Sequence, residues 1–189
     1  LDKMMLPHQS DLLRTQLLIK YGGVWADPTI FPLKPLDDWL FDHMQAGYFL
    51  FYKPGRDRII ANWFIAAEPG NTMLKELYSA LIDYWNKNDF KNISNPKTGK
   101  VVQINRFINR NLYLPKLWFT PVFTKILRLC TYMVYHHMFY NLLSKNNILK
   151  KQFELMPKIS ADLPLSFKKE ILKDHLDEEL KKIVDQKKS

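Results

Sequence analysis

The spacing of apolar residues predicts a helical chain interrupted by a few strands. In the first half, apolar residues three to four positions apart predict helices over 9–21, 37–41 and 72–87. Runs of apolar and aromatic residues predict strands over 24–29, 46–52 and 59–67. Because each strand is short, these segments need partners in order to form a sheet.

Capping and turn residues set the expected boundaries of these elements. Ser10 is a candidate N-cap, which would place Asp11 at the positive end of the helix dipole. Gly22 is a candidate C-cap for the same helix. The dipeptide Pro54-Gly55 predicts the turn between the second and third strands.

The second half of the chain is predicted to be mostly helical. Helices are expected over 105–111, 122–144, 149–155 and 168–186, and loops over 88–100 and 157–167. No internal repeat or long linker divides the sequence. Residues 1–189 are therefore expected to form a single α/β domain with a helix-rich C-terminal half.

Composition narrows the class of protein. The chain has 189 residues, 47% of them hydrophobic, which argues against disorder. Its one cysteine, Cys130, excludes an internal disulfide framework and fits a reducing compartment. The longest uncharged stretch of the basic middle segment, 129–144, falls short of the roughly 20 apolar residues of a membrane span. We therefore expect a cytoplasmic location, with peripheral contact at the inner face of the membrane as an alternative.

The net charge of +9 favours anionic partners, and its distribution is uneven. Residues 86–151 carry twelve Lys or Arg and one acid, Asp89. Basic residues mixed with aromatic ones over 111–139 have two interpretations: contact with an anionic membrane surface, or an ordinary core helix with its charges in solvent. No nucleic-acid-binding motif is present, so no nucleic-acid partner is expected.

The stretch "SDLLRTQLLIKYGGVWADPT" concentrates the candidate chemistry. Asp11 and Arg14 share one flank of the predicted helix, and two glycines allow that helix to pack close to the next strand. In that strand, side chains two residues apart point the same way, which groups Trp25, Asp27 and Thr29. Each residue alone also fits an ordinary role, such as an ion pair, a cap or a turn.

This stretch resembles the Ser-Asp-x-x-Arg … Tyr-Gly-Gly-x-Trp-x-Asp signature of the capsular polysaccharide synthesis protein family, sugar transferases with a DXD motif that are similar to glycosyltransferase family 32. "NWFIAAEPGNTML", residues 62–74, resembles the family's next landmark. The resemblance implies a GT-A-type nucleotide-sugar-binding fold. It also implies that the N-terminal nucleotide-binding strands of the family are missing before Ser10.

The resemblance also implies roles for particular residues. Donor-binding residues would be Asp11, Arg14, Gly22, Gly23, Trp25 and Asp27, with Arg14 near the diphosphate. Asp27 and Asn62 would be catalytic, and Asp27, Thr29 and Asp162 would bind a divalent cation, Mn²⁺ or Mg²⁺. Thr29 replaces the second acid of the DXD motif, which weakens the metal site because a hydroxyl brings no charge.

The implied reaction is transfer of a hexose from a nucleotide sugar, a UDP-sugar, with retention of configuration. The acceptor would be an oligosaccharide or lipid-linked saccharide of a bacterial capsule or surface polysaccharide. Two alternatives remain: an inactive truncated relic or partner subunit, and a basic module that binds membrane surfaces. The adjacent His136 and His137 diverge on a helix and do not predict a metal site, although His136 or Tyr135 is a candidate for lining the acceptor pocket.

Overall fold

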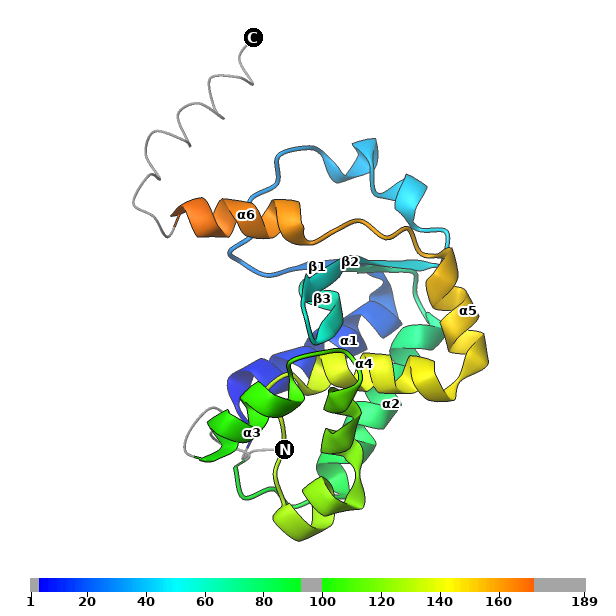
Figure 1. Cartoon of the computed structure of the whole chain (residues 1–189). Helices are drawn as coiled ribbons and strands as arrows, with labels where there is room; N and C mark the ends of the chain where they lie inside the picture. The colour runs from blue at the N-terminus through cyan, green and yellow to red at the C-terminus, as the bar shows by residue number, and fades with distance from the viewer. Residues whose placement is uncertain (1–3, 93–99, 172–189) are drawn as a thin grey trace.

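A computed structural model describes residues 4–92 and 100–171 (Figure 1). The fold is mixed α/β, as predicted, with helices dominating the second half. Its strands are β1 Gly23–Ala26, β2 Tyr48–Gly55 and β3 Arg58–Ala67. Its α-helices are α1 Leu6–Tyr21, α2 Thr72–Asn86, α3 Lys100–Ile108, α4 Val134–Lys145, α5 Asn147–Leu155 and α6 Asp162–Ile171.

The three strands form one antiparallel sheet in the order β1-β3-β2. In the central strand, Ile65 pairs with Trp25 on one side and with Leu50 on the other. The turn between β2 and β3 lies two residues later than predicted, because Gly55 still pairs with Arg58. The turn residues are therefore Arg56 and Asp57.

Helices α1 and α4 pack against one face of the sheet, and α2 packs against both of these helices (Figure 1). Leucines at helical spacing give α2 a buried face, and Asn71 caps its start by accepting a hydrogen bond from the Leu74 amide. Tyr135 and Phe139 of α4 are buried in the same core. The segment before β2, with short 3₁₀ turns at Leu36–Asp38 and Phe41–His43, covers the other face, where the Trp39 ring contacts Phe49 and Phe64.

The C-terminal part returns to the sheet at the edge formed by β2. The Tyr52 amide donates to the Ile159 carbonyl at 2.7 Å, and the Ala161 amide donates to the Tyr52 carbonyl at 2.8 Å. This pairing forms a parallel bridge between Tyr52 and Ser160. It leads directly into α6, which begins inside the predicted loop 157–167; the predicted terminal helix 168–186 lies mostly outside the described residues.

Three predicted helices need correction. The first begins at Leu6, with Pro7 in its first turn, so Ser10 is not the N-cap and Asp11 lies in the second turn. The predicted helix 122–144 is broken. A π-helical turn over Val122–Leu127 ends at Arg128, whose backbone is left-handed with φ 56°, and α4 begins only at Val134. The predicted helix 105–111 runs instead over Lys100–Ile108, and a 3₁₀ turn over Leu114–Phe119 follows it.

Candidate functional site

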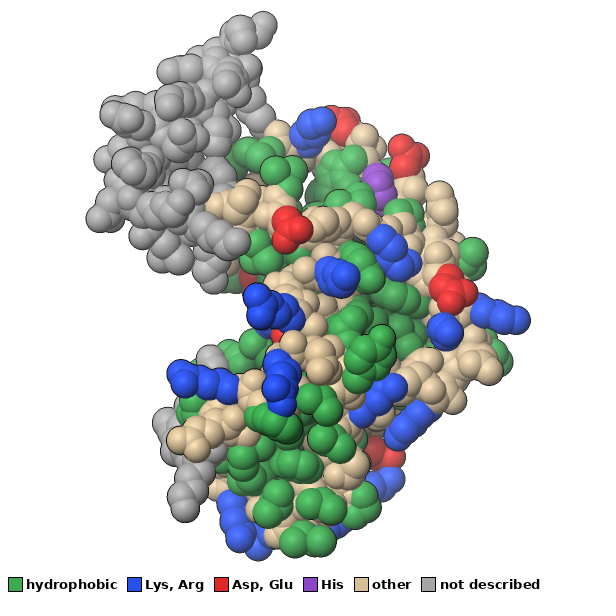
Figure 2. Space-filling view, in the orientation of Figure 1, with side chains coloured by type: hydrophobic (Ala, Val, Ile, Leu, Met, Phe, Trp, Pro, Cys, Tyr) green, Lys and Arg blue, Asp and Glu red, His purple; other side chains and the backbone are tan. Residues whose placement is uncertain are grey.

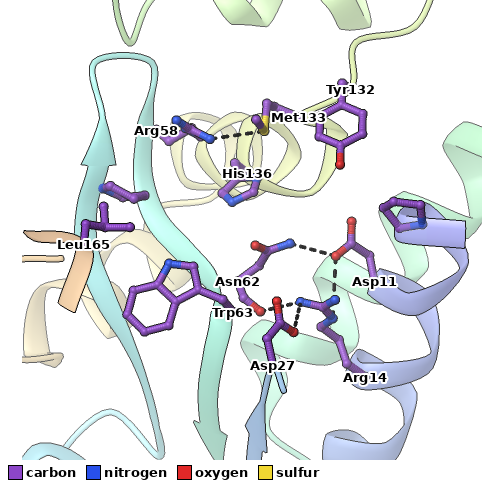
Figure 3. Close-up of a pocket in the computed structure, with 12 residues that line it drawn as sticks. Asp11, Arg14, Asp27, Arg58, Asn62, Trp63, Tyr132, Met133, His136 and Leu165 are labelled. Atoms are coloured by element: carbon purple, nitrogen blue, oxygen red, sulfur yellow. Dashed lines mark hydrogen bonds and ion pairs between the residues drawn. The ribbon is translucent and has the colours of Figure 1, made fainter. Parts of the chain in front are cut away.

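A pocket of about 310 Å³ lies where α1, the end of β1, β3 and α4 meet (Figure 3). Asp11 and Arg14 enter it from α1, Asp27 follows β1, and Asn62 comes from β3. Its remaining wall is formed by Pro7, Pro54, Arg58, Trp63, Tyr132, Met133, His136 and Leu165. The two motifs that carried the family resemblance therefore meet at a single pocket.

Arg14 is the centre of a polar network in this pocket. Its Nη1 donates to the Asn62 carbonyl at 2.5 Å and lies 3.5 Å from Asp27 Oδ1. Its Nη2 donates to Ser10 Oγ at 2.9 Å, and its Nε donates to the Ser10 carbonyl at 3.3 Å. All three guanidinium nitrogens thus contact oxygens of the protein, and the side chain is buried.

Asp11 completes the network from the preceding turn of α1. Its Oδ1 accepts a hydrogen bond from Asn62 Nδ2 at 2.8 Å and lies 3.6 Å from Arg14 Nε. Burial raises the pKa of the Asp11 carboxyl to about 7, even though Arg14 and Asn62 favour the charged form. Asp11 therefore exchanges a proton near neutral pH.

Asp27 is fixed by the backbone and by the tryptophan two residues before it. Its amide donates to the Trp63 carbonyl at 2.8 Å, which continues the pairing of β1 with β3. Its Oδ1 accepts from Trp25 Nε1 at 2.9 Å, so Trp25 and Asp27 do point the same way. The Trp25 ring in turn lies 5.0 Å from the Arg14 guanidinium.

A second cation, Arg58, enters the pocket from the start of β3. Its Nε lies 3.2 Å from Asp57 Oδ1, and its Nη1 contacts the Met133 sulfur at 3.2 Å. The other oxygen of Asp57 lies 3.0 Å from Nε2 of the buried His137. Burial raises the pKa of Asp57, but the hydrogen bond from His137 and the charge of Arg58 outweigh it, so the pKa is lowered. Burial lowers the pKa of His137. A neutral imidazole therefore donates a hydrogen bond to the Asp57 carboxylate.

His136 lies beside Arg58 in the pocket wall. It is 7% exposed, and among the described residues its Nδ1 has no hydrogen-bond partner. Burial, together with the nearby charges of Arg58 and His137, lowers the pKa of His136 well below its usual value. The side chain is therefore neutral at physiological pH. Of the two residues expected to line an acceptor pocket, His136 lines this pocket, and Tyr135 is buried in the core.

The predicted glycines act on the backbone and do not line the pocket. Gly22 and Gly23 have φ values of 67° and 86°, a region that favours glycine. A Cβ on Gly22 would lie 2.6 Å from Cδ of Pro69, so this glycine allows α1 to end against the turn after β3. The close approach at this point is therefore to the turn after β3, whereas the sequence predicted close packing against the next strand.

Of the three predicted metal ligands, one lines the pocket. Asp27 lines the pocket, whereas Thr29 and Asp162 are exposed and do not. Asp162 begins α6, and its carboxylate accepts a hydrogen bond from Ser160 Oγ at 2.9 Å. Within residues 4–92 and 100–171, no group of three or more His, Cys, Asp or Glu has metal-binding geometry.

Arg58 and Trp63 are pocket residues that the sequence did not indicate. Trp63 stacks on Phe51 with ring centroids 4.9 Å apart, which presents a flat aromatic surface beside Asn62. Trp63 follows Asn62, a residue of the second motif, so the sequence could have indicated it as a pocket residue. Arg58 had no such signal, because its place depends on the hairpin turn and on α4.

A separate feature is an exposed surface over α3 and the turns at 114–127, which we call the basic apolar surface. Its exposed apolar members are Phe107, Tyr113, Leu117, Val122, Ile126 and Leu127. Arg106, Arg110 and Lys125 are exposed in the same segments. Figure 2 shows apolar side chains gathered at this end of the molecule, with Lys and Arg at the margin.

Among the described residues, no helix combines the length and apolar character that a bilayer crossing requires.

Comparison with known proteins supports the resemblance. Residues 2–92 match the capsular polysaccharide synthesis protein family. Over 86 residues the chain is 30% identical to the O-glycosyltransferase braB of Annulohypoxylon truncatum. The match covers 41% of this chain and 20% of the relative, so the chain spans about a fifth of that protein's length. This relative is fungal, which does not support the expected bacterial origin. No solved structure matches the chain significantly.

Proposed function

We propose that this chain, whose residues 2–92 match the capsular polysaccharide synthesis family, is part of a glycosyltransferase that uses a nucleotide-sugar donor. The observation that carries the proposal is the network of Asp11, Arg14, Asp27 and Asn62 in one pocket. These residues come from segments up to 51 positions apart, and both segments belong to the matched region.

The pocket offers the chemistry that sugar binding requires. Carboxylate and amide groups of Asp11 and Asn62 can exchange hydrogen bonds with sugar hydroxyls, and the Trp63 ring can cover an apolar sugar face or a base. Arg14 holds these groups at fixed distances, because it contacts Asn62 and both carboxylates. The site is therefore ordered before a donor binds, which lowers the entropic cost of binding.

The finer features of the proposal follow the family resemblance. They are a UDP-hexose donor, retention of configuration, a GT-A-type fold for the complete protein and a saccharide acceptor. Asp27 would hold a divalent cation together with the donor phosphates, since Mg²⁺ commonly binds one or two carboxylates and substrate phosphate. When bound, the cation would neutralise charge on the departing diphosphate. Trp25 and Arg14 both contact Oδ1 of Asp27, so these two contacts leave Oδ2 for the cation.

The test is binding of UDP-sugars, measured by thermal shift with and without Mn²⁺ or Mg²⁺. We expect stabilisation by a UDP-sugar that increases with metal and is lost in Asp27→Ala. Asp42→Ala is the matched control, because this exposed carboxylate does not line the pocket. The same stabilisation in Asp27→Ala would contradict the role of Asp27. No stabilisation with any nucleotide sugar would contradict the proposal and favour an inactive relic.

A second, compatible role is peripheral contact with an anionic membrane. The basic apolar surface favours it, because exposed apolar side chains can enter the headgroup region while Arg and Lys pair with acidic lipids. Such contact would suit an enzyme whose acceptor is lipid-linked.

A further inference from the structure

The two arginines of the pocket differ in how many of their donors the protein already uses. Arg14 contacts protein oxygens through all three nitrogens, and its side chain is 7% exposed. Arg58 faces one carboxylate and a thioether, and its side chain is 23% exposed. Because a thioether is a weak acceptor, Arg58 keeps donor capacity for another group.

The charges around the two arginines differ as well. Arg14 lies between two carboxylates, Asp11 and Asp27, which together oppose the approach of an anion. Arg58 is paired with Asp57, which does not line the pocket, and its neighbour in the wall is the neutral His136. Without a bound cation, the Arg58 side of the pocket is therefore more favourable for an anion than the Arg14 side, where Asp27 and the charged fraction of Asp11 oppose it.

The Arg58 side chain is held in place from several directions. Its guanidinium lies over Gly55, where a Cβ would come within 2.6 Å of Nη2. Asp57 fixes the Nε side, and the buried His137 fixes Asp57. Beside it in the pocket wall lies the buried, neutral His136 (Figure 3).

We propose that Arg58, with His136 beside it, binds the diphosphate of the donor, and that Arg14 instead organises the sugar-binding groups. This assignment rests on the proposed function and changes the role that the family resemblance gave to Arg14. Asp57 and His137 are positioning residues for Arg58. The planar guanidinium suits a diphosphate, because it offers paired donors to phosphate oxygens.

The test compares the binding of inorganic pyrophosphate, UDP and uridine by isothermal titration calorimetry. We expect Arg58→Gln to weaken pyrophosphate and UDP binding by about tenfold or more and to leave uridine binding unchanged. Arg58→Lys should recover part of the loss, because it restores charge without the planar fork. Arg56→Gln is the matched control, since this exposed arginine of the same turn does not line the pocket.

Several results would overturn the inference. They are unchanged pyrophosphate affinity in Arg58→Gln, an equal loss in Arg56→Gln, and absence of pyrophosphate and UDP binding in the wild type. Circular dichroism shows whether each variant is folded. If Arg58→Gln does not fold, the pyrophosphate affinity of Arg58→Lys tests the inference instead. If diphosphate binding depends on Arg58 but no sugar is transferred from any donor, the transferase assignment fails and this inference stands. If a UDP-sugar binds and reacts equally well in Arg58→Gln, only this inference fails.

Discussion

Asp11 is a carboxyl group whose burial has a consequence for stability. Its pKa rises from 3.8 to about 7 on folding, so between these values the folded chain binds a proton that the unfolded chain has released. The free energy of unfolding therefore falls as the pH rises through this interval, and the loss is complete above about pH 7. Since one pKa unit corresponds to about 1.4 kcal/mol, the titration of Asp11 lowers the free energy of unfolding by on the order of 4 kcal/mol across this interval.

We expect Asp11→Asn to remove this contribution, because asparagine does not titrate and its side-chain oxygen can still accept from Asn62. The measurement is urea unfolding at intervals from pH 4 to pH 8, for the wild type and for the variant. Asp162→Asn, at an exposed carboxyl, controls for the loss of one acid. Parallel pH profiles for Asp11→Asn and the wild type would show that Asp11 titrates normally.

At the scale of elements, the junction between α1 and β1 depends more on Gly22 than on Gly23. Both Gly22 and Gly23 have positive φ, but a Cβ on Gly22 meets Pro69 at 2.6 Å, and one on Gly23 meets nothing within 4 Å. We expect Gly22→Ala to destabilise the protein by about 3 kcal/mol, through strain and overpacking, and Gly23→Ala by about 1 kcal/mol. Chemical denaturation of the two variants checks the difference; equal losses would mean that the contact with Pro69 contributes nothing.

The sequence was most informative where local pattern and tertiary packing agree. The strands and the helix after Asn71 were predicted because their apolar residues, which are buried in the structure, form runs or repeat at helical spacing. The first helix was also predicted, but Leu13 and Leu17, whose spacing indicated it, are exposed. The break that ends the first part of the predicted helix 122–144 at Arg128 was not predicted, because it depends on contacts between residues distant in the sequence. The Lys91 amide donates to the Arg128 carbonyl, and Asn92 exchanges hydrogen bonds with the Cys130 backbone.

The same distinction applies to the pocket. Asp11, Arg14 and Asp27 lie within 17 residues of one another, so a short motif could indicate them, and Asn62 belongs to a second motif. Arg58 and His136 come together only when the β2–β3 hairpin packs on α4, an arrangement that local pattern does not encode. The assignment of Thr29 and Asp162 as partners of Asp27 stays a prediction, and the structure places neither in the pocket.

At the scale of the whole molecule, the basic apolar surface is distinct from the pocket, since the two share no residue. We expect the protein to bind vesicles that contain phosphatidylglycerol, and this binding to weaken as salt is raised. The double variant Val122→Ser, Ile126→Ser should weaken it by about tenfold, because two exposed apolar side chains no longer enter the headgroup region. Vesicle co-sedimentation measures the effect.

The control for this experiment is Ile148→Ser, Leu155→Ser, which removes two equally exposed apolar side chains from α5. An equal loss of vesicle binding in the control would mean that any exposed apolar residue supports binding. Binding that persists in the Val122 and Ile126 variant and is insensitive to salt would rule out this surface as the contact.

The order of the sheet has one more consequence. The outer side of β2 is occupied by the bridge to Ser160, whereas among the described residues β1 pairs only with β3. The unpaired amides and carbonyls of β1 are thus a template for strand addition, and the sheet can be extended in that direction alone. Any strand that docks there, from this protein or from another, would lie directly beside Trp25 and Asp27. A peptide that pairs with this edge would therefore change the surroundings of Asp27 without entering the pocket.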